Sequence, residues 1–206
     1  LLEAVTLNPA MGFYLNTRGN QKENNRGRQP DENYAREVMQ LMSIGLQQLE
    51  ADGTPKTGAD GQPLDSYTQN DVSQLARVFT GYDLDIKPGE QNGFRPPGAS
   101  YTVETRDWTT RPMVLDASGH SMLEAKFLGA TVPANTPGAA ALKIALDTLF
   151  NHPNVGPFIG RQLIQRLVTS NPSPAYVKRV AAAFADNGAG VRGDMKAVFA
   201  AVLIDD

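Results

Sequence analysis

Apolar residues recur at helical spacing in the first and last thirds of the chain. In "PDENYAREVMQLMSIGL" four of them fall at i, i+4, i+7 and i+8, the period of one helix face: Tyr34, Val38, Leu41 and Met42. Asp31 stands before them as an N-cap, and Gly45 stands where a left-handed residue ends a helix. The pattern therefore predicts a helix over 31–45.

Cap and proline signals predict the remaining helices. Pro after Asn, Thr or Ser favours a helix start, and Asp or Thr before an apolar stripe acts as a cap. The segments predicted in this way are 1–15, with a restart at Asn8-Pro9, and 68–81, 136–150, 157–167, 173–187 and 194–204.

Helical spacing is absent from Tyr82 to Pro137, where Pro, Gly and Thr are frequent. Short stretches there have β character: "SYTVETRDW", "RPMVLD" and "AKFLGATV". We expect the last two to pair with each other. Residues 16–30, rich in Asn, Arg and Gly, predict a solvated loop, and residues 50–66, with two Asp-Gly and two Pro, predict a hairpin-like excursion.

These elements predict a mainly α fold: a helical bundle-like domain of about six to seven helices with a small irregular, β-containing insertion in its middle. We divide the chain into an N-terminal helical segment (1–81), the insertion (82–135) and a C-terminal helical segment (136–206), packed as one domain. No repeat of fixed period is evident. The chain begins without Met, in the middle of a helical pattern, so we expect a fragment of a longer protein.

Composition narrows the possible chemistry. The formal net charge of −3 over 206 residues, with no basic stripe, argues against nucleic acid as a partner. No apolar run is long enough for a membrane span. Cysteine is absent and only His120 and His152 are present, so we predict no metal site and no cofactor. The acids of residues 50–66 lack the ligand pattern of a calcium loop.

Glu37 and His120 are the candidate catalytic residues. Glu37 lies at the edge of the apolar stripe, where partial burial would raise its pKa and suit proton transfer. The structural alternative is that Glu37 pairs with Arg77 or with a backbone N–H and fixes two helices together. His120, in the irregular middle and near Glu124, is either a base or a hydrogen-bonded structural residue.

Five further residues are candidate binding residues. Three of them lie on predicted helices, namely Asn33, Arg36 and Arg77. The other two, Trp108 and Lys126, lie in the irregular middle of the chain. Trp108, with Tyr101, could stack on a sugar, although a single Trp also serves as a core anchor. Arg36 could contact an anionic ligand, or it could pair with Glu32 at i, i+4.

Six segments in order resemble one bacterial family, domain of unknown function 1800. They are "NPAMGFYLN", "ENYAREVMQLMSIGL", "YTQNDVSQLARVFTGY", "HSMLEAKFLG", "HPNVGPFIGRQLIQRLV" and "GDMKAVFAAVLIDD". The resemblance implies a carboxy-terminal portion, an exported (periplasmic or extracellular) protein, a missing amino-terminal half as partner, and a sulfatase-like protein encoded nearby. It implies no reaction. The family more often has His where this chain has Asn8 and Met42, and Asp where it has Ser121, which removes polar groups that a metal or acid–base site would use.

Two functional hypotheses follow. The first is a non-catalytic exported domain that binds a partner protein or an envelope polymer, because no complete catalytic set is present. The second is a hydrolase or lyase acting on an extracellular polymer through Glu37 and His120, with Arg77 as a further participant. Convergence of these side chains in a concave pocket would favour the second hypothesis.

Overall fold

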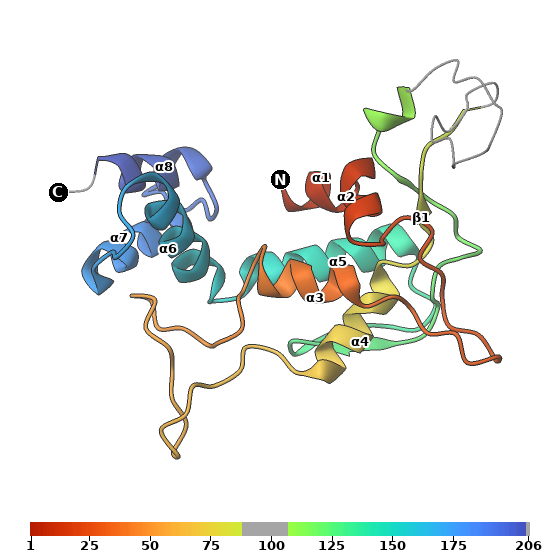
Figure 1. Ribbon diagram of the computed structural model, residues 1–206, viewed down its shortest axis with the longest axis horizontal. Helices are drawn as coiled ribbons and strands as arrows, with labels where there is room; N and C mark the ends of the chain where they lie inside the picture. Colours follow the sequence, from red (N-terminus) through yellow and green to blue (C-terminus); the bar gives the residue numbers. More distant parts are fainter. Residues whose placement is uncertain (88–106, 205–206) are drawn as a thin grey trace, which may run out of the picture. The chain divides into compact units, whose positions relative to one another are not determined.

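The structure, a computed structural model, describes residues 1–87 and 107–204. These residues form eight α-helices (Figure 1): α1 (Leu2–Thr6), α2 (Pro9–Tyr14), α3 (Asn33–Gln40), α4 (Gln69–Val78), α5 (Gly138–Asn151), α6 (Val155–Leu167), α7 (Pro174–Ala185) and α8 (Met195–Leu203). The predicted mainly α class, with a small strand-containing middle, is confirmed. None of the helices in the described part of the chain has both the length and the apolar character needed to cross a membrane.

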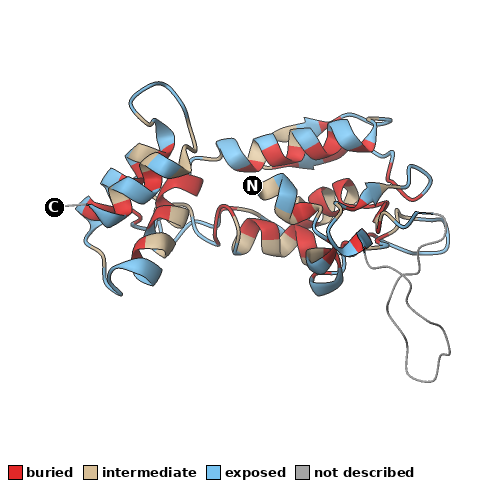
Figure 2. Ribbon diagram, turned by 90° about the horizontal axis from the view of Figure 1, so that it is seen from above, coloured by how far each residue is buried: buried red, intermediate tan, exposed pale blue. Residues whose placement is uncertain are grey.

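Three helix starts follow the predicted caps, whereas α6 begins at Val155, two residues before the predicted start at Pro157. The Asn8 side chain accepts the Ala10 N–H at 2.9 Å, directly before Pro9 opens α2. Ser173 accepts the Tyr176 N–H before α7, and Asp194 accepts the Lys196 N–H before α8. Each cap satisfies a backbone donor that the first helical turn leaves without a partner. Buried and exposed positions then alternate along each helix (Figure 2), as amphipathic spacing requires.

The helix predicted over 31–45 is shorter than expected, because α3 ends at Gln40. The Ser43 hydroxyl donates to the Val38 carbonyl, and the Gly45 N–H donates to the Met39 carbonyl, so the chain turns away from the helix axis. Leu41, predicted on the buried face, is 57% exposed as a result. The left-handed backbone expected at Gly45 is confirmed, with φ of 73°.

The strands pair differently from the expectation. β1 (Tyr82–Asp83) pairs with β2 (Val114–Leu115), and β3 (Ala125–Phe127) pairs with β4 (Ala130–Val132), both antiparallel. "AKFLGATV" therefore folds on itself and does not pair with "RPMVLD". Its turn, Leu128-Gly129, has positive φ at both residues (48° and 79°), the backbone of a two-residue hairpin. Of "SYTVETRDW", residues 100–106 lie outside the described residues, and Trp108 lies in a 3₁₀ turn, η1 (Asp107–Thr109).

Contacts between Cα atoms divide the chain into two compact units. Unit 1 comprises residues 1–36 and 69–146, and unit 2 comprises residues 37–68 and 147–206. The boundaries fall inside α3 and α5. The three-segment organisation within one domain stays a prediction.

Unit 1 is centred on Tyr34. The Tyr34 ring meets the Phe79 ring edge-on at 4.8 Å between centroids, and its hydroxyl donates to the Thr6 hydroxyl at 2.7 Å. Burial raises the pKa of Tyr34 to about 12, so this hydroxyl stays a donor at all ordinary pH values. Helix α4 packs on β3, where the Asp71 carboxylate accepts the Leu128 N–H at 2.8 Å.

Residues 16–30 are not simply a solvated loop, because two of their polar side chains, Thr17 and Asn20, are buried. Backbone hydrogen bonds tie this segment to the rest of unit 1: Gly19 N–H to Tyr82 O, Lys22 N–H to Gly119 O, and Gly81 N–H to Asn20 O. These backbone partners lie far away in sequence, so the local composition carried no sign of them. The segment is a fixed part of unit 1.

Unit 2 joins α6, α7 and α8 to residues 41–66. Asn154, which is 2% exposed, makes the connection. Its side-chain oxygen accepts the Leu49 N–H at 3.0 Å, and its side-chain nitrogen donates to the carbonyls of Ile44 (2.9 Å) and Gln47 (2.7 Å). One amide thereby satisfies three backbone groups of a segment without regular secondary structure.

Residues 49–65 contain a repeat of eight residues that the sequence analysis did not find. "EADGTP" and "GADGQP" are equivalent at this spacing, and so are their turns: Glu50 N–H to Thr54 O and Gly58 N–H to Gln62 O, both 2.8 Å. Three backbone bonds close a ring around the repeat, from Gln48 N–H to Leu64 O, Leu64 N–H to Lys56 O, and Lys56 N–H to Gln48 O. The predicted hairpin-like excursion is confirmed, and it is doubled, as two successive turns in the orange to yellow part of Figure 1.

Candidate functional site

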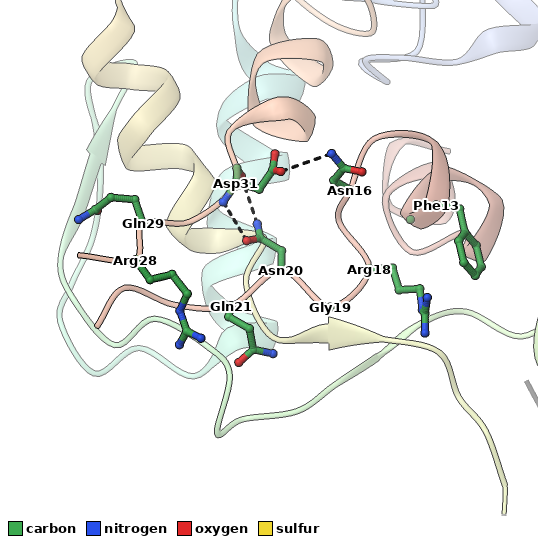
Figure 3. Close-up of a pocket in the computed structure, with 10 residues that line it drawn as sticks. Phe13, Asn16, Arg18, Gly19, Asn20, Gln21, Arg28, Gln29 and Asp31 are labelled. Carbon is green, nitrogen blue, oxygen red and sulfur yellow. Dashed lines mark hydrogen bonds between the residues drawn. The ribbon is translucent and has the colours of Figure 1, made fainter. Parts of the chain in front are cut away.

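A polar pocket of about 560 Å³ opens in unit 1. Its lining comes from the end of α2 and from the segment that leads to α3: Gly12, Phe13, Asn16, Arg18, Gly19, Asn20, Gln21, Arg28, Gln29 and Asp31. We call it the 12–31 pocket. Four side-chain amides and two guanidinium groups dominate this lining. Figure 3 shows Asn20 and Asp31 between Arg18 and Phe13 on one side and Arg28 and Gln29 on the other.

Asn20 holds the pocket together. Its side-chain oxygen accepts the Asp31 N–H at 2.9 Å, and its side-chain nitrogen donates to the Asp31 carbonyl at 3.2 Å. This pair of bonds, dashed in Figure 3, joins residue 20 to residue 31 and so closes the loop between them. Because Asn20 is 7% exposed, the two bonds are shielded from water and fix the opening of the pocket.

Arg18 and Phe13 form one wall. The Arg18 Nε–H donates to the Asp83 carboxylate at 3.0 Å, and the guanidinium carbon lies 4.7 Å from the centre of the Phe13 ring. Phe13 is 43% exposed, whereas Trp108, 6.2 Å from it between ring centroids, is 6% exposed. The buried Trp108 therefore supports Phe13, and Phe13 supplies the apolar surface of the pocket.

Arg28 lies on the opposite wall. Its Nε–H donates to the Lys22 carbonyl at 2.8 Å, and its backbone N–H donates to the Asn24 side-chain oxygen at 3.0 Å. The Asn24 oxygen also accepts the Arg26 N–H, so one side chain stabilises the turn over residues 24–28. Arg28 is exposed, and its terminal guanidinium nitrogens make no hydrogen bond within the described ranges 1–87 and 107–204. Because Arg28 lines the pocket, these nitrogens are donors that a ligand could use.

Asp31 is the carboxylate of the pocket. One of its oxygens accepts the Asn33 N–H at 2.8 Å, which is the helix-start contact predicted from the sequence. The other accepts a long contact, 3.4 Å, from the Asn16 side chain. Asn16 itself has a left-handed backbone, with φ of 61°, a conformation that Asn tolerates better than most residues.

The predicted pair of Glu32 and Arg36 is present, with 3.2 Å between charged atoms. It belongs to a cluster that joins α3 to α4: Gln69 accepts from Arg36 at 2.9 Å and donates to Glu32 at 2.7 Å, and the Ser73 hydroxyl donates to Glu32 at 2.5 Å. Arg36 thus has neighbours in unit 1 for its charge. The arrangement fits the ion pair with Glu32 that the sequence offered as the alternative to ligand binding by Arg36.

Arg77 and Lys126 lie where α4 meets β3. Arg77 donates to the Gln74 side chain at 2.9 Å and to the Glu124 carbonyl at 2.6 Å. The Lys126 ammonium pairs with the Glu124 carboxylate at 2.7 Å, and both side chains are at least half exposed. Neither residue lines the 12–31 pocket.

His120 is 2% exposed. Its Nδ1 lies 3.0 Å from the Thr80 carbonyl, and the Thr80 hydroxyl accepts the Ser121 N–H at 2.8 Å. These contacts attach the turn before β3 to the end of α4. Glu37 is half-buried on the part of α3 that belongs to unit 2, whereas His120 belongs to unit 1. Their joint catalytic role stays a prediction.

None of the seven candidate residues predicted from the sequence lines the 12–31 pocket. Trp108 supports Phe13 of the lining from behind. The residues that line the pocket were assigned to a solvated loop. One signal was available: residues 16–30 contain six amide side chains and four cations without apolar period, which is unusually rich in hydrogen-bonding groups. Within the described residues, no group of three His, Asp or Glu side chains could hold a metal ion.

Comparison with known proteins gives a family and no activity. Neither the curated proteins nor the solved structures contain a significant match to this chain. A family profile described as "Protein of unknown function (DUF1800)" matches residues 1–206, the whole length given. The chain therefore belongs to the DUF1800 family of proteins of unknown function.

Proposed function

We propose that this chain is a non-catalytic exported domain that binds an envelope polymer, a polysaccharide, in the 12–31 pocket. The observation that carries the proposal is the composition of the lining: four amide side chains, two arginines and one exposed aromatic ring around about 560 Å³. Amides both donate and accept, so they match the hydroxyl groups of a sugar. The exposed Phe13 surface matches the C–H groups of a sugar ring.

The same lining favours binding over hydrolysis. Glycoside hydrolysis ordinarily needs two carboxyl groups on either side of the scissile bond. Among the described residues that line this pocket, Asp31 is the single carboxylate, and it already accepts hydrogen bonds from Asn33 and Asn16. No Ser, Thr or His lines it to act as nucleophile or base in the part of the chain described. The pocket offers recognition without a reacting pair.

Binding assays with and without the aromatic wall test the proposal. We expect the purified chain to co-sediment with bacterial cell-wall sacculi or to bind at least one soluble polysaccharide in affinity electrophoresis. Phe13→Ala should weaken that binding about three- to tenfold, the loss of one aromatic packing contact. Phe199→Ala is the matched control, because Phe199 is exposed to a similar degree (40%) on α8 and lines none of the pocket. No binding to any polymer, or equal losses for the two variants, would refute the proposal.

The alternative, that the chain is an enzyme, is tested separately with the variant Glu37→Gln. A hydrolase or lyase that used Glu37 and His120, with Arg77 assisting, would lose its turnover in Glu37→Gln while its melting temperature stayed nearly unchanged. The burial of His120 and its contact with Thr80 support a structural role instead. Measurable depolymerisation that Glu37→Gln abolishes would replace binding as the function.

The family resemblance adds three features to the proposal. The protein is exported, and its two partners are the amino-terminal half of the same protein and a sulfatase-like protein encoded nearby. An apolar hollow of about 470 Å³ beside α1 and α2 supports the first partner. It is lined by Ala4, Val5, Asn8, Ala10, Met11 and Tyr14, and Tyr14 is 77% exposed. Co-purification of the separately expressed amino-terminal half, lost on Tyr14→Ser, tests that partner.

A further inference from the structure

The 12–31 pocket is positively charged on an acidic protein. The whole chain has a formal charge of −3, whereas residues 12–31 contain four cations and two acids, a formal charge of +2. One of the two acids, Glu23, accepts a hydrogen bond from the Ser121 hydroxyl at 2.8 Å, and the other, Asp31, lines the pocket. A cationic segment on an acidic background attracts anions to that place rather than to the surface in general.

Both arginines of the pocket are anchored in the same way. Arg18 donates its Nε–H to Asp83 and Arg28 donates its Nε–H to the Lys22 carbonyl. Each anchor uses the inner nitrogen of the guanidinium and leaves the two terminal nitrogens as the outward donors, which is the pair that binds a carboxylate or phosphate in a bidentate way. An arginine whose stem is already fixed loses little side-chain entropy when it binds.

The lining contains two arginines and one carboxylate, Asp31, so its formal charge is +1. Arg18 shares its charge with Asp83, at a contact where the arginine is 34% and the aspartate 51% exposed, so the pairing is weakened by solvent. Asp31 directs one oxygen to the backbone of Asn33 and the other toward Asn16. Arg28, exposed and bonded through Nε to a neutral carbonyl, has no carboxylate partner in the described structure.

From these contacts we infer that the polymer bound in the 12–31 pocket is anionic: a polysaccharide whose carboxylate or phosphodiester groups are held by Arg28 and Arg18 while the amides hold its hydroxyls. This inference rests on the proposed function and names its ligand class. It also assigns Arg28 as the residue that discriminates anionic from neutral polymers. Neutral sugars would still meet Phe13 and the amides, so they should bind more weakly, and independently of Arg28.

A pair of polymers that differ only in charge tests the inference. The probes are polygalacturonate and its fully methyl-esterified form, with poly(glycerol phosphate) as a second anion and dextran as a neutral polymer. We expect the chain to bind polygalacturonate or poly(glycerol phosphate) about tenfold more tightly than the ester and dextran, and to lose that preference as salt is raised. Whichever anion binds more tightly identifies the charged group.

Three variants locate the effect. Arg28→Gln should bind the preferred anionic polymer about tenfold more weakly, the loss of one charge-assisted contact, and the ester as before. Arg26→Gln removes the same charge from the same segment at a residue that does not line the pocket, so it should retain the preference. Arg28→Lys keeps the charge but loses the pair of terminal nitrogens, so its affinity for the anionic polymer should lie between those of the original chain and of Arg28→Gln.

Each outcome decides between the claims. Equal binding of charged and esterified polymers would overturn the inference and leave the proposed function standing, whereas binding to none of the polymers would overturn both. Equal losses in Arg26→Gln and Arg28→Gln would mean general attraction to the segment and would remove Arg28 from its role. A loss in Arg28→Lys as large as in Arg28→Gln would mean that the charge at position 28 contributes nothing to the preference, which would also overturn the assignment.

Discussion

The eight-residue repeat offers a matched pair of substitutions, Gly53→Ala and Gly61→Ala. The two glycines are equivalent in the repeat and have nearly the same backbone, with φ of 79° and 76°. They differ in what surrounds them. A Cβ at Gly53 would lie 2.9 Å from Cγ1 of Val177 on α7, whereas a Cβ at Gly61 would meet nothing within 4 Å.

The expected magnitudes follow from these surroundings. A left-handed backbone costs an L-residue about 1–2 kcal/mol, and both variants lose this amount. Gly53→Ala adds overpacking against Val177, which is 2% exposed and has little room to move, at about 1–3 kcal/mol. Gly61→Ala should therefore reduce the free energy of unfolding by about 1–2 kcal/mol and Gly53→Ala by about 2–5 kcal/mol.

Urea unfolding followed by circular dichroism measures both losses in the same chain. The backbone cost cancels in the difference, which reports the packing of the first turn on α7 alone. In a Val177→Ala background the penalty of Gly53→Ala should fall toward that of Gly61→Ala, as a double-mutant cycle would show. Equal penalties in the original background would refute the reasoning, because they would mean that the first turn is not packed on Val177.

Three further predictions concern stability. Asn154→Ala should lower the free energy of unfolding by about 2–4 kcal/mol in urea titrations, because it leaves buried backbone groups without partners; a loss below about 1 kcal/mol would contradict the contacts of this side chain. Tyr34→Phe should lower it by about 1–2 kcal/mol in the same assay, since the Thr6 hydroxyl loses a donor; no loss would contradict that bond. Burial, and secondarily Lys56, lower the pKa of His152 below its usual 6.5, so the unfolded chain binds this proton more readily and stability should fall as pH is lowered through about 6.5 toward the folded-state value. Melting temperatures over that range should show a shallower fall for His152→Asn, and an unchanged slope would contradict the shift.

The sequence predicted helix starts well where a cap depends on contacts between residues close together in the chain. Asn8, Ser173 and Asp194 cap helices with bonds to residues two or three positions away, and such bonds can be read directly from the order of residues. The end of α3 was wrong because the Ser43 hydroxyl competes for the Val38 carbonyl, an interaction that apolar spacing does not report.

The candidate site could not be predicted because its organising contacts are remote in sequence or involve the main chain. Asn20 meets Asp31 across eleven positions, and Arg18 meets Asp83 across sixty-five. In the sequence, residues 16–30 show only the polar composition that is typical of a loop. Arg36 was identified correctly as part of an ion pair with Glu32, but its additional contact with Gln69 depends on the packing of α3 on α4.

The central claim is that the 12–31 pocket is where a polysaccharide binds, and amide proton–nitrogen correlation spectra recorded during titration with short oligomers of the polymer that binds most tightly test it most directly. The account predicts progressive, saturable shifts concentrated in the amides of residues 12–31 and in the Arg18 and Arg28 side chains, with the amides of α8 unmoved. Saturable shifts that spare residues 12–31 and gather elsewhere, or no shifts at all, would contradict it.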